Sequence, residues 1–343
     1  MKRLLSCIIV HHRHSEEGYL TPQIDKFSGQ PLINVLGEHL HLGVHGFKVT
    51  RDMDLNIVDT LLFKYLFSEG HAGDESIVMM RELYLRRRQI ETLILGNRID
   101  VGVVDMVAMR NACSLQHLRN PTFWCLPSRF ADDVSHGMTT EFLVENYAPF
   151  WLKPSRFLNR PIGFNIYNLG FDEITLLVTV SCFDWTQPRN VNLIFIPAED
   201  LFRHWYCIVI DFGNKKAFLL DTWPDYKMQL ERFALAKSLL VKLNEIIHGP
   251  LFAQVTTYSV PEIKDWEIEV VDGIPNCDDG ECSPTWVISW LDPLGYFSSK
   301  GHSGVLQDDS IRARTAISLA GGPFNIYGRM LRDSAEHWHK ELS

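Results

Sequence analysis

The sequence predicts an α+β protein in which helical segments come early in the chain and strands follow. Helical periodicity recurs in the first third of the chain, at residues 54–67, 73–94 and 101–113. Segments rich in β-branched residues come later, at residues 173–183, 191–197 and 265–271. Two apolar runs joined by Gly213-Asn214, within residues 204–222, are typical of a β-hairpin. Because helices and strands are largely segregated along the chain, the pattern favours the α+β class.

The bulk composition sets limits on what the chain does. Its 343 residues, 46% of them hydrophobic, are enough for one large domain or two small ones. A formal net charge of −9 makes phosphate contacts unfavourable, so no nucleic-acid partner is expected. No run approaches the ~18 consecutive apolar residues of a membrane-spanning helix, so no membrane partner is expected either.

Cysteine usage points to a reducing compartment. The seven cysteines are scattered and contain no CxxC pair, which disfavours a zinc site. No metal site is predicted, and His11, His12 and His14 are interpreted as part of a solvated loop. The apolar run near the N-terminus is interpreted as a short strand, since no small-residue cleavage site follows it. An intracellular protein, nuclear or cytoplasmic and not secreted, is the expectation.

The helices have recognisable ends. In residues 73–94 acidic residues come early and arginines late, as the helix dipole favours. Asp100 is placed to cap the helix expected over 101–113. Further helices are expected near 139–147, over 228–250, where Gly-Pro stops an amphipathic pattern, and over 308–322.

The hairpin brings two polar residues together. If its turn centres on Gly213 and Asn214, Tyr206 pairs with Asp221. His204, two residues before Tyr206, then lies on the same face as Asp221, roughly 7–8 Å away along the diagonal. An imidazole and a carboxylate can bridge that distance. An isolated pair of this kind is more often two frayed strand ends than an active site, so a third member is needed.

Cys282 supplies that third member. It lies just before an apolar segment that Pro284 opens and Pro293 ends, which predicts a buried helix. A cysteine at a helix N-terminus has a lowered thiol pKa, because the helix dipole stabilises the thiolate. A cysteine, a histidine and an orienting aspartate are the parts of a thiol acyl-transfer site. Cys277, five residues before Cys282, is interpreted as a loop thiol that could compete as nucleophile.

These spacings resemble the adenain-like cysteine proteases that process ubiquitin-like proteins, above all the SUMO-deconjugating group. In that family a His-Trp dipeptide opens a strand, an Asp follows 17 residues later, and a Gln precedes the nucleophile by six. Here His204-Trp205 and Asp221 keep the first spacing, and Asn276 and Cys282 keep the second. The resemblance covers residues 90–320. It implies an adenain-like fold, with a central mixed sheet flanked by helices and the nucleophile at the N-terminus of a buried helix.

The resemblance is strongest to the plant, transposon-associated branch of the family. Members of that branch carry segments similar to residues 61–93 ahead of the protease core and to residues 309–325 behind it. It suggests an N-terminal extension over 1–89, mixed strand then helical, and a catalytic domain over 90–343.

The sequence departs from the family at four positions. Asn276 replaces the Gln of the oxyanion hole, Glu281 replaces an Asp, and Ser283 replaces a Gly. Arg98 stands where many members have one of the two Trp residues that enclose the Gly-Gly tail of the substrate, so only Trp205 remains.

The resemblance implies a role for each site residue. Cys282 is the nucleophile, His204 the general base and acid, and Asp221 orients the imidazole; Asn276 and the Cys282 N–H stabilise the oxyanion. Trp205 and Arg98 are the substrate-binding candidates. The expected function is cleavage of SUMO-type modifiers from precursors or conjugates, without a cofactor and with the modifier or its conjugates as partners. The alternatives are a pseudo-protease that only binds a protein partner, and an acyltransferase using the same triad.

Overall fold

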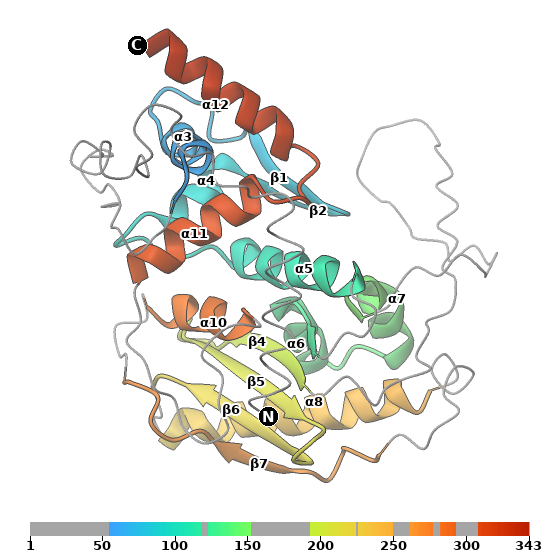
Figure 1. Cartoon of the computed structure of the whole chain (residues 1–343). Helices are drawn as coiled ribbons and strands as arrows, with labels where there is room; N and C mark the ends of the chain where they lie inside the picture. Colours follow the sequence, from blue (N-terminus) through green and yellow to red (C-terminus); the bar gives the residue numbers. More distant parts are fainter. Residues whose placement is uncertain are drawn as a thin grey trace, which may run out of the picture. The chain divides into compact units, whose positions relative to one another are not determined.

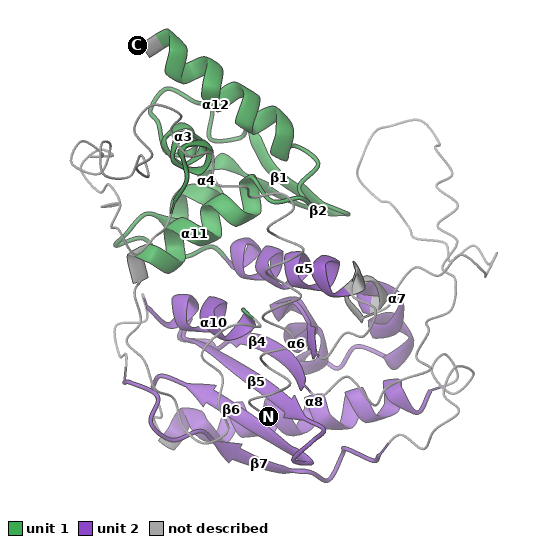
Figure 2. Cartoon of the chain, in the orientation of Figure 1, with its two compact units in different colours: residues 1–100, 292–296, 305–343 green, residues 101–291, 297–304 purple. Residues whose placement is uncertain are grey.

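The computed structural model describes residues 55–117, 123–151, 193–223, 226–249, 261–276, 282–292 and 308–342. The chain divides into two compact units, shown in Figure 2. Unit 1 comprises residues 1–100, 292–296 and 305–343, and unit 2 comprises residues 101–291 and 297–304. The expected strands near the N-terminus and at 173–183 lie outside the described residues.

A five-stranded mixed sheet forms the centre of unit 2, as the fold class predicted (Figure 1). Its strands are, in spatial order, β3 (Phe123–Cys125), β4 (Leu193–Glu199), β5 (Trp205–Asp211), β6 (Lys216–Asp221) and β7 (Glu267–Val270). The two outer pairs are parallel and the two inner pairs antiparallel. All seven residues of β5 are buried, so this central strand is covered on both faces.

Helices surround this sheet, and four of them were expected from the sequence, near 101–113, 139–147 and 228–250 and directly after Cys282. They are α5 (Val101–His117), α6 (Ser128–Ser135), α7 (Thr140–Trp151), α8 (Tyr226–Ile247) and α10 (Ser283–Leu291). α10 packs against β5 and α5, α6 packs against β4, and α8 contacts β6 and β7. The helix α6 was not predicted; a buried carboxylate of α5, Asp105, accepts hydrogen bonds from the Ser128 N–H and hydroxyl at its N-terminus, at 2.6 and 2.7 Å.

Unit 1 joins the beginning of the described chain to its end. It contains α3 (Ile57–Leu66), β1 (Ser76–Met80), β2 (Leu83–Arg86), α4 (Arg87–Ile90), the 3-10 turn η2 (Glu91–Leu93), α11 (Asp308–Ala320) and α12 (Gly328–Leu342). α3 packs against both α11 and α12. Residues 61–93 and 309–325, far apart in the sequence, therefore contribute to one compact unit.

The prediction of a helix over residues 73–94 is wrong. Residues 76–86 form the antiparallel β1–β2 hairpin, and helix begins only at Arg87. Arg81 turns the chain with a φ of 53°, a left-handed conformation that interrupts a helix. Asn325 explains why this segment forms a strand and not a helix. Its side chain accepts from the Met79 N–H and donates to the Ile77 carbonyl, both at 2.9 Å. Pairing with a distant loop thus overrides the local helical pattern.

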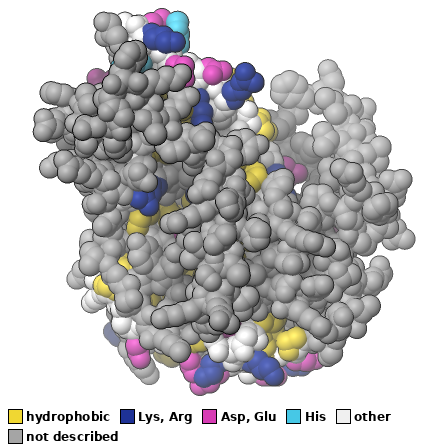
Figure 3. Space-filling model, viewed as in Figure 1, with side chains coloured by type: hydrophobic (Ala, Val, Ile, Leu, Met, Phe, Trp, Pro, Cys, Tyr) yellow, Lys and Arg dark blue, Asp and Glu magenta, His cyan; other side chains and the backbone are white. Residues whose placement is uncertain are grey.

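The surface in view carries charges of both signs. Acidic and basic side chains lie beside one another in the lower part of Figure 3, where Figure 1 places β7. Lys216 of β6, for example, pairs with both Glu267 and Glu269 of β7. None of the helices that the structure describes is long and apolar enough to span a bilayer.

Candidate active site

His204 lies immediately before β5 and is held by its backbone. Its N–H donates to Asp200 Oδ1 and its carbonyl accepts from the Asp200 N–H, both at 2.9 Å. The residue is 1% exposed. Tyr206 pairs with Asp221 across the β5–β6 ladder, so the register expected from the Gly-Asn turn is confirmed. That register places His204 and Asp221 on one face of the hairpin.

The imidazole of His204 has one anchored nitrogen and one without a partner. Its Nε2 lies 2.8 Å from Asp221 Oδ1. Its Nδ1 is buried and has no hydrogen-bond partner within the part of the chain that the structure describes. The ring of Trp223 contacts the imidazole edge-on, with centroids 5.8 Å apart. Because an ionised carboxylate only accepts, the neutral ring carries its proton on Nε2, which leaves Nδ1 as a base.

Asp221 is fixed by three donors. Besides His204 Nε2, its Oδ1 accepts from the Trp223 N–H at 2.9 Å. Its Oδ2 accepts from the guanidinium of Arg232 on α8. The carboxylate side chain has no exposed surface, so these three contacts replace its solvation. This is the arrangement that orients an imidazole and stabilises its charged form.

Cys282 lies at the N-terminus of α10, as expected. Its carbonyl accepts from the Trp286 N–H at 3.1 Å, the first hydrogen bond of the helix. All nine residues of α10 are buried. Cys282 itself is half-buried and is disulfide-bonded in this structure, so attack through this sulfur requires reduction first.

Two hydrogen bonds join α10 to the sheet and to α5. At its start, Ser283 Oγ accepts from the Trp205 N–H at 3.1 Å, which joins the residue after Cys282 to the residue after His204. At its end, Asn111 of α5 donates to the Leu291 carbonyl at 2.7 Å. The serine that departs from the family pattern therefore makes a structural contact that a glycine could not make.

The other predicted site residues are less clearly assembled. Asn276 is exposed. Trp205 has no exposed surface, so contact with a substrate tail requires the residues that cover it to move. Arg98 is half-buried and belongs to unit 1. Glu281 and Cys277 lie outside the described residues.

Other thiols of the described residues are poor nucleophiles. Cys113, Cys125 and Cys207 are buried. Burial raises the pKa of the Cys207 thiol, and the neighbouring Cys125 raises it further. Cys207 therefore stays protonated, which makes it inert.

Sequence reasoning missed Arg232 and Asp200. Arg232 Nη2 donates to Asp200 Oδ2 at 2.7 Å, and Nη1 donates to Asp221 Oδ2 and to the Trp223 carbonyl. A signal was present: Arg232 occupies the apolar stripe of α8, four residues after buried Met228 and four before buried Ala236. A charged residue in such a stripe needs a buried partner.

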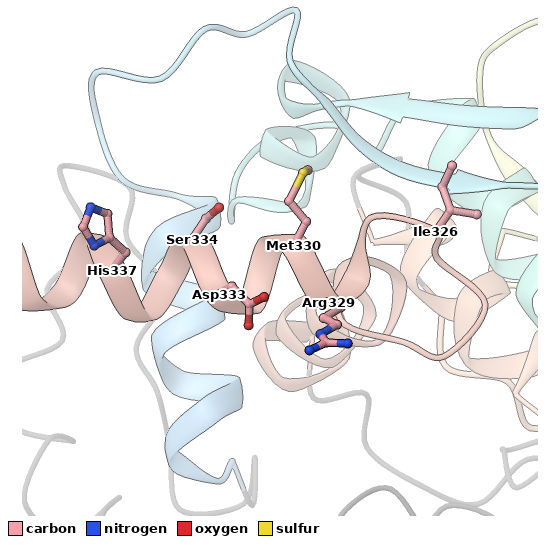
Figure 4. A pocket seen from close by; sticks show the side chains of 6 residues that line it. All are labelled: Ile326, Arg329, Met330, Asp333, Ser334 and His337. Carbon is pink, nitrogen blue, oxygen red and sulfur yellow. The ribbon is translucent and has the colours of Figure 1, made fainter.

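A separate open groove of about 560 Å³ lies on unit 1. Figure 4 shows that five of its lining side chains come from α12 and that Ile326 comes from the turn before it. It contains none of the triad residues. Among the residues that the structure describes, no cluster of three or more His, Cys, Asp or Glu could hold a metal ion.

The fold is that of SUMO protease catalytic domains. The SUMO protease Ulp1 with its catalytic cysteine oxidised to a sulfenic acid superimposes with a TM-score of 0.50 and 16% identity, covering 79% of this chain and 98% of that one. The C-terminal Ulp1 protease domain in complex with Smt3, the yeast ortholog of SUMO, gives 0.50 and 14%, covering 82% and 99%. No family model and no curated protein matches the sequence.

Proposed function

We propose that the reduced protein is a cysteine peptidase that cleaves SUMO-type modifiers from precursors or conjugates. The observation that carries this proposal is the buried His204–Asp221 pair, at 2.8 Å, with a partnerless Nδ1 on the same imidazole. The hydrogen bond between Trp205 and Ser283 supports the assignment of Cys282 as its third member. The fold adds independent support, because its solved neighbours are peptidases of this class.

The proposed chemistry proceeds through a thioester. His204 Nδ1 takes the thiol proton of Cys282, and the thiolate attacks the carbonyl carbon of the scissile bond. The imidazolium, stabilised by Asp221, then protonates the leaving amine. Water, deprotonated by the same imidazole, hydrolyses the acyl-thioester and restores the thiol. The Cys282 N–H and the Asn276 amide are the proposed oxyanion donors.

The substrate class is proposed from the structural neighbour that binds Smt3. Trp205 and Arg98 are proposed to enclose the modifier's tail, with Arg98 weakening the preference for Gly-Gly. Membership of the plant, transposon-associated branch is a further proposal, which rests on the resemblance of residues 61–93 and 309–325. A catalytic domain over residues 90–343 and a nuclear or cytoplasmic location are also proposals.

The decisive experiment is labelling of the reduced protein with a panel of ubiquitin-like proteins that bear C-terminal thiol-reactive warheads. We expect an adduct on Cys282 with SUMO-type probes and none in Cys282→Ser. The Cys207→Ser variant is the matched control, since it removes a buried, inert thiol and should label like wild type. Absence of labelling by every probe would overturn the proposed activity.

One observation favours a second candidate function. Asn276, Glu281 and Ser283 depart from the family pattern around the nucleophile, and such departures are expected of a pseudo-protease that only binds its protein partner. The two functions separate in the same experiment: a pseudo-protease would bind an unmodified modifier but form no adduct after reduction.

A further inference from the structure

Arg232 bridges the two carboxylates that hold His204. The guanidinium is 1% exposed. Through Nη1 it donates to Asp221 Oδ2, and through Nη2 it donates to Asp200 Oδ2 at 2.7 Å. Nη1 also donates to the Trp223 carbonyl at 2.8 Å, which fixes the chain just beyond Asp221. A planar guanidinium can make these contacts together because its donors form a rigid fork.

Asp221 and Asp200 each form hydrogen bonds to a different part of His204. Asp221 contacts the imidazole through Nε2. Asp200 contacts the backbone: its Oδ1 accepts from the N–H groups of His204 and Phe202, each at 2.9 Å. Arg232 therefore connects the side-chain anchor of His204 to its backbone anchor.

The charges explain why the bridge is needed. Asp200 and Asp221 are both buried, with side-chain exposures of 6% and 0%. Two buried carboxylates repel each other and lose hydration unless a cation lies between them. Arg232 provides that cation, and it also packs over the ring of Tyr206, 5.3 Å from the centroid. With it in place, Asp221 keeps Oδ1 directed at the imidazole.

We propose that Arg232 is a positioning residue for the catalytic histidine: by clamping Asp221 and Asp200 together it locks the imidazole in the tautomer and orientation that leave Nδ1 free to accept a proton. The inference rests on the proposed peptidase function for its catalytic consequence. Its structural part, the locked Nε2–H tautomer, is independent of any substrate.

The variants must separate positioning from charge. Arg232→Met alone removes a buried cation as well as the link between Asp221 and Asp200, so it does not separate the two effects. The double variant Arg232→Met/Asp200→Asn removes one charge of each sign, and the asparagine oxygen still accepts from the two backbone N–H groups. Arg232→Lys retains the charge but lacks the fork. The control is Arg129→Met, which removes an ion pair with buried Asp105 in the same unit.

The first readout is the downfield proton NMR resonance of His204 Nε2–H, assigned by its loss in His204→Gln. We expect it in wild type and in Arg129→Met. We expect it to be lost or broadened by exchange in the double variant, with circular dichroism confirming that the fold is retained. An unshifted resonance of full intensity in the folded double variant would overturn the inference.

The second readout is turnover of whichever modifier the warhead panel identifies. We expect kcat of the double variant to fall about 100-fold, the scale of a small misplacement of a catalytic group, with KM within twofold of wild type. Arg232→Lys should recover part of that loss. Wild-type kcat in the double variant would refute the catalytic role of Arg232.

The outcomes distinguish this inference from the proposed function. An Arg232-dependent resonance without adduct formation on any modifier would support the inference and overturn the proposed activity. Efficient turnover that is unaffected by Arg232 would do the reverse.

Discussion

Replacing Asp221 with asparagine should inactivate the site by a route that the hydrogen bonds specify. Oδ1 accepts from His204 Nε2 and from the Trp223 N–H, and Oδ2 accepts from Arg232. An asparagine has only one oxygen, so its NH₂ must face either Arg232 or both donors to Oδ1. If the NH₂ takes the Oδ1 place, Nε2 becomes the acceptor and the ring proton moves to Nδ1.

The size of the loss follows from both effects. A proton on Nδ1 blocks acceptance of the thiol proton, and the missing negative charge no longer stabilises the imidazolium 2.8 Å away. In a serine protease triad the equivalent change lowers kcat by about 10⁴-fold. That corresponds to about 5.5 kcal/mol of activation free energy. We expect Asp221→Asn to lower kcat by at least 10³-fold, with KM little changed.

The assay is single-turnover cleavage of a SUMO C-terminal fluorogenic amide by the reduced protein. Asp211→Asn is the matched control, because Asp211 is also buried and lies at the opposite end of the same hairpin, where it accepts from Asn214. It should alter turn stability and leave kcat nearly unchanged. If folded Asp221→Asn retained more than a tenth of wild-type kcat, the proposed role of Asp221 would be refuted.

Four other changes test separate parts of the reasoning. Arg98→Trp should raise the labelling rate of Gly-Gly-ended probes; an unchanged or lower rate would remove Arg98 from the substrate tunnel. Asn276→Ala should lower single-turnover cleavage by ~10²-fold if the amide reaches the oxyanion, whereas little effect together with a gain in Asn276→Gln would indicate that the shorter side chain does not reach. Ser283→Ala leaves the Trp205 N–H without its acceptor and should lower the free energy of unfolding by about 1–3 kcal/mol in denaturant titrations. A loss below about 0.5 kcal/mol, half the net contribution of a hydrogen bond, would contradict this. Burial raises the pKa of Asp105 to about 6, so the folded state binds this proton more tightly than the unfolded state does. The resulting stability is present at low pH and is lost, by about 3 kcal/mol, as the pH rises from about 4 to 6. Asp105→Asn should flatten that part of the profile of unfolding free energy against pH, and parallel profiles for the two proteins would contradict the prediction.

The hairpin register and the start of α10 could be predicted because each depends on local residues. Gly213-Asn214 fixes the turn, and the period of two along a strand then places Asp221 opposite Tyr206. Pro284 and the apolar residues after it are sufficient to predict a buried helix beginning near Cys282. Both predictions depend on neighbouring residues in the sequence and not on partners elsewhere in the chain.

The helix α12 was missed although its signal is local. Leu331 and Ala335 are buried at a spacing of four along Gly328–Leu342, between charged residues. This is the amphipathic pattern that predicts a helix packed on one side. α3 provides the surface that it covers.

The sequence by itself therefore determined the pairing of the hairpin, the buried helix after Cys282 and the residue types of the candidate triad. The tertiary structure decided which polar partners come from segments far away in the sequence. Residues 76–86 became strands because Asn325 satisfies their backbone groups from 246 residues away at Met79. Arg232 became buried because Asp200 and Asp221 meet it from two other elements. The physical reason is the same in both cases: a buried polar group is stable only beside its partner, and the partner's position is a property of the folded chain.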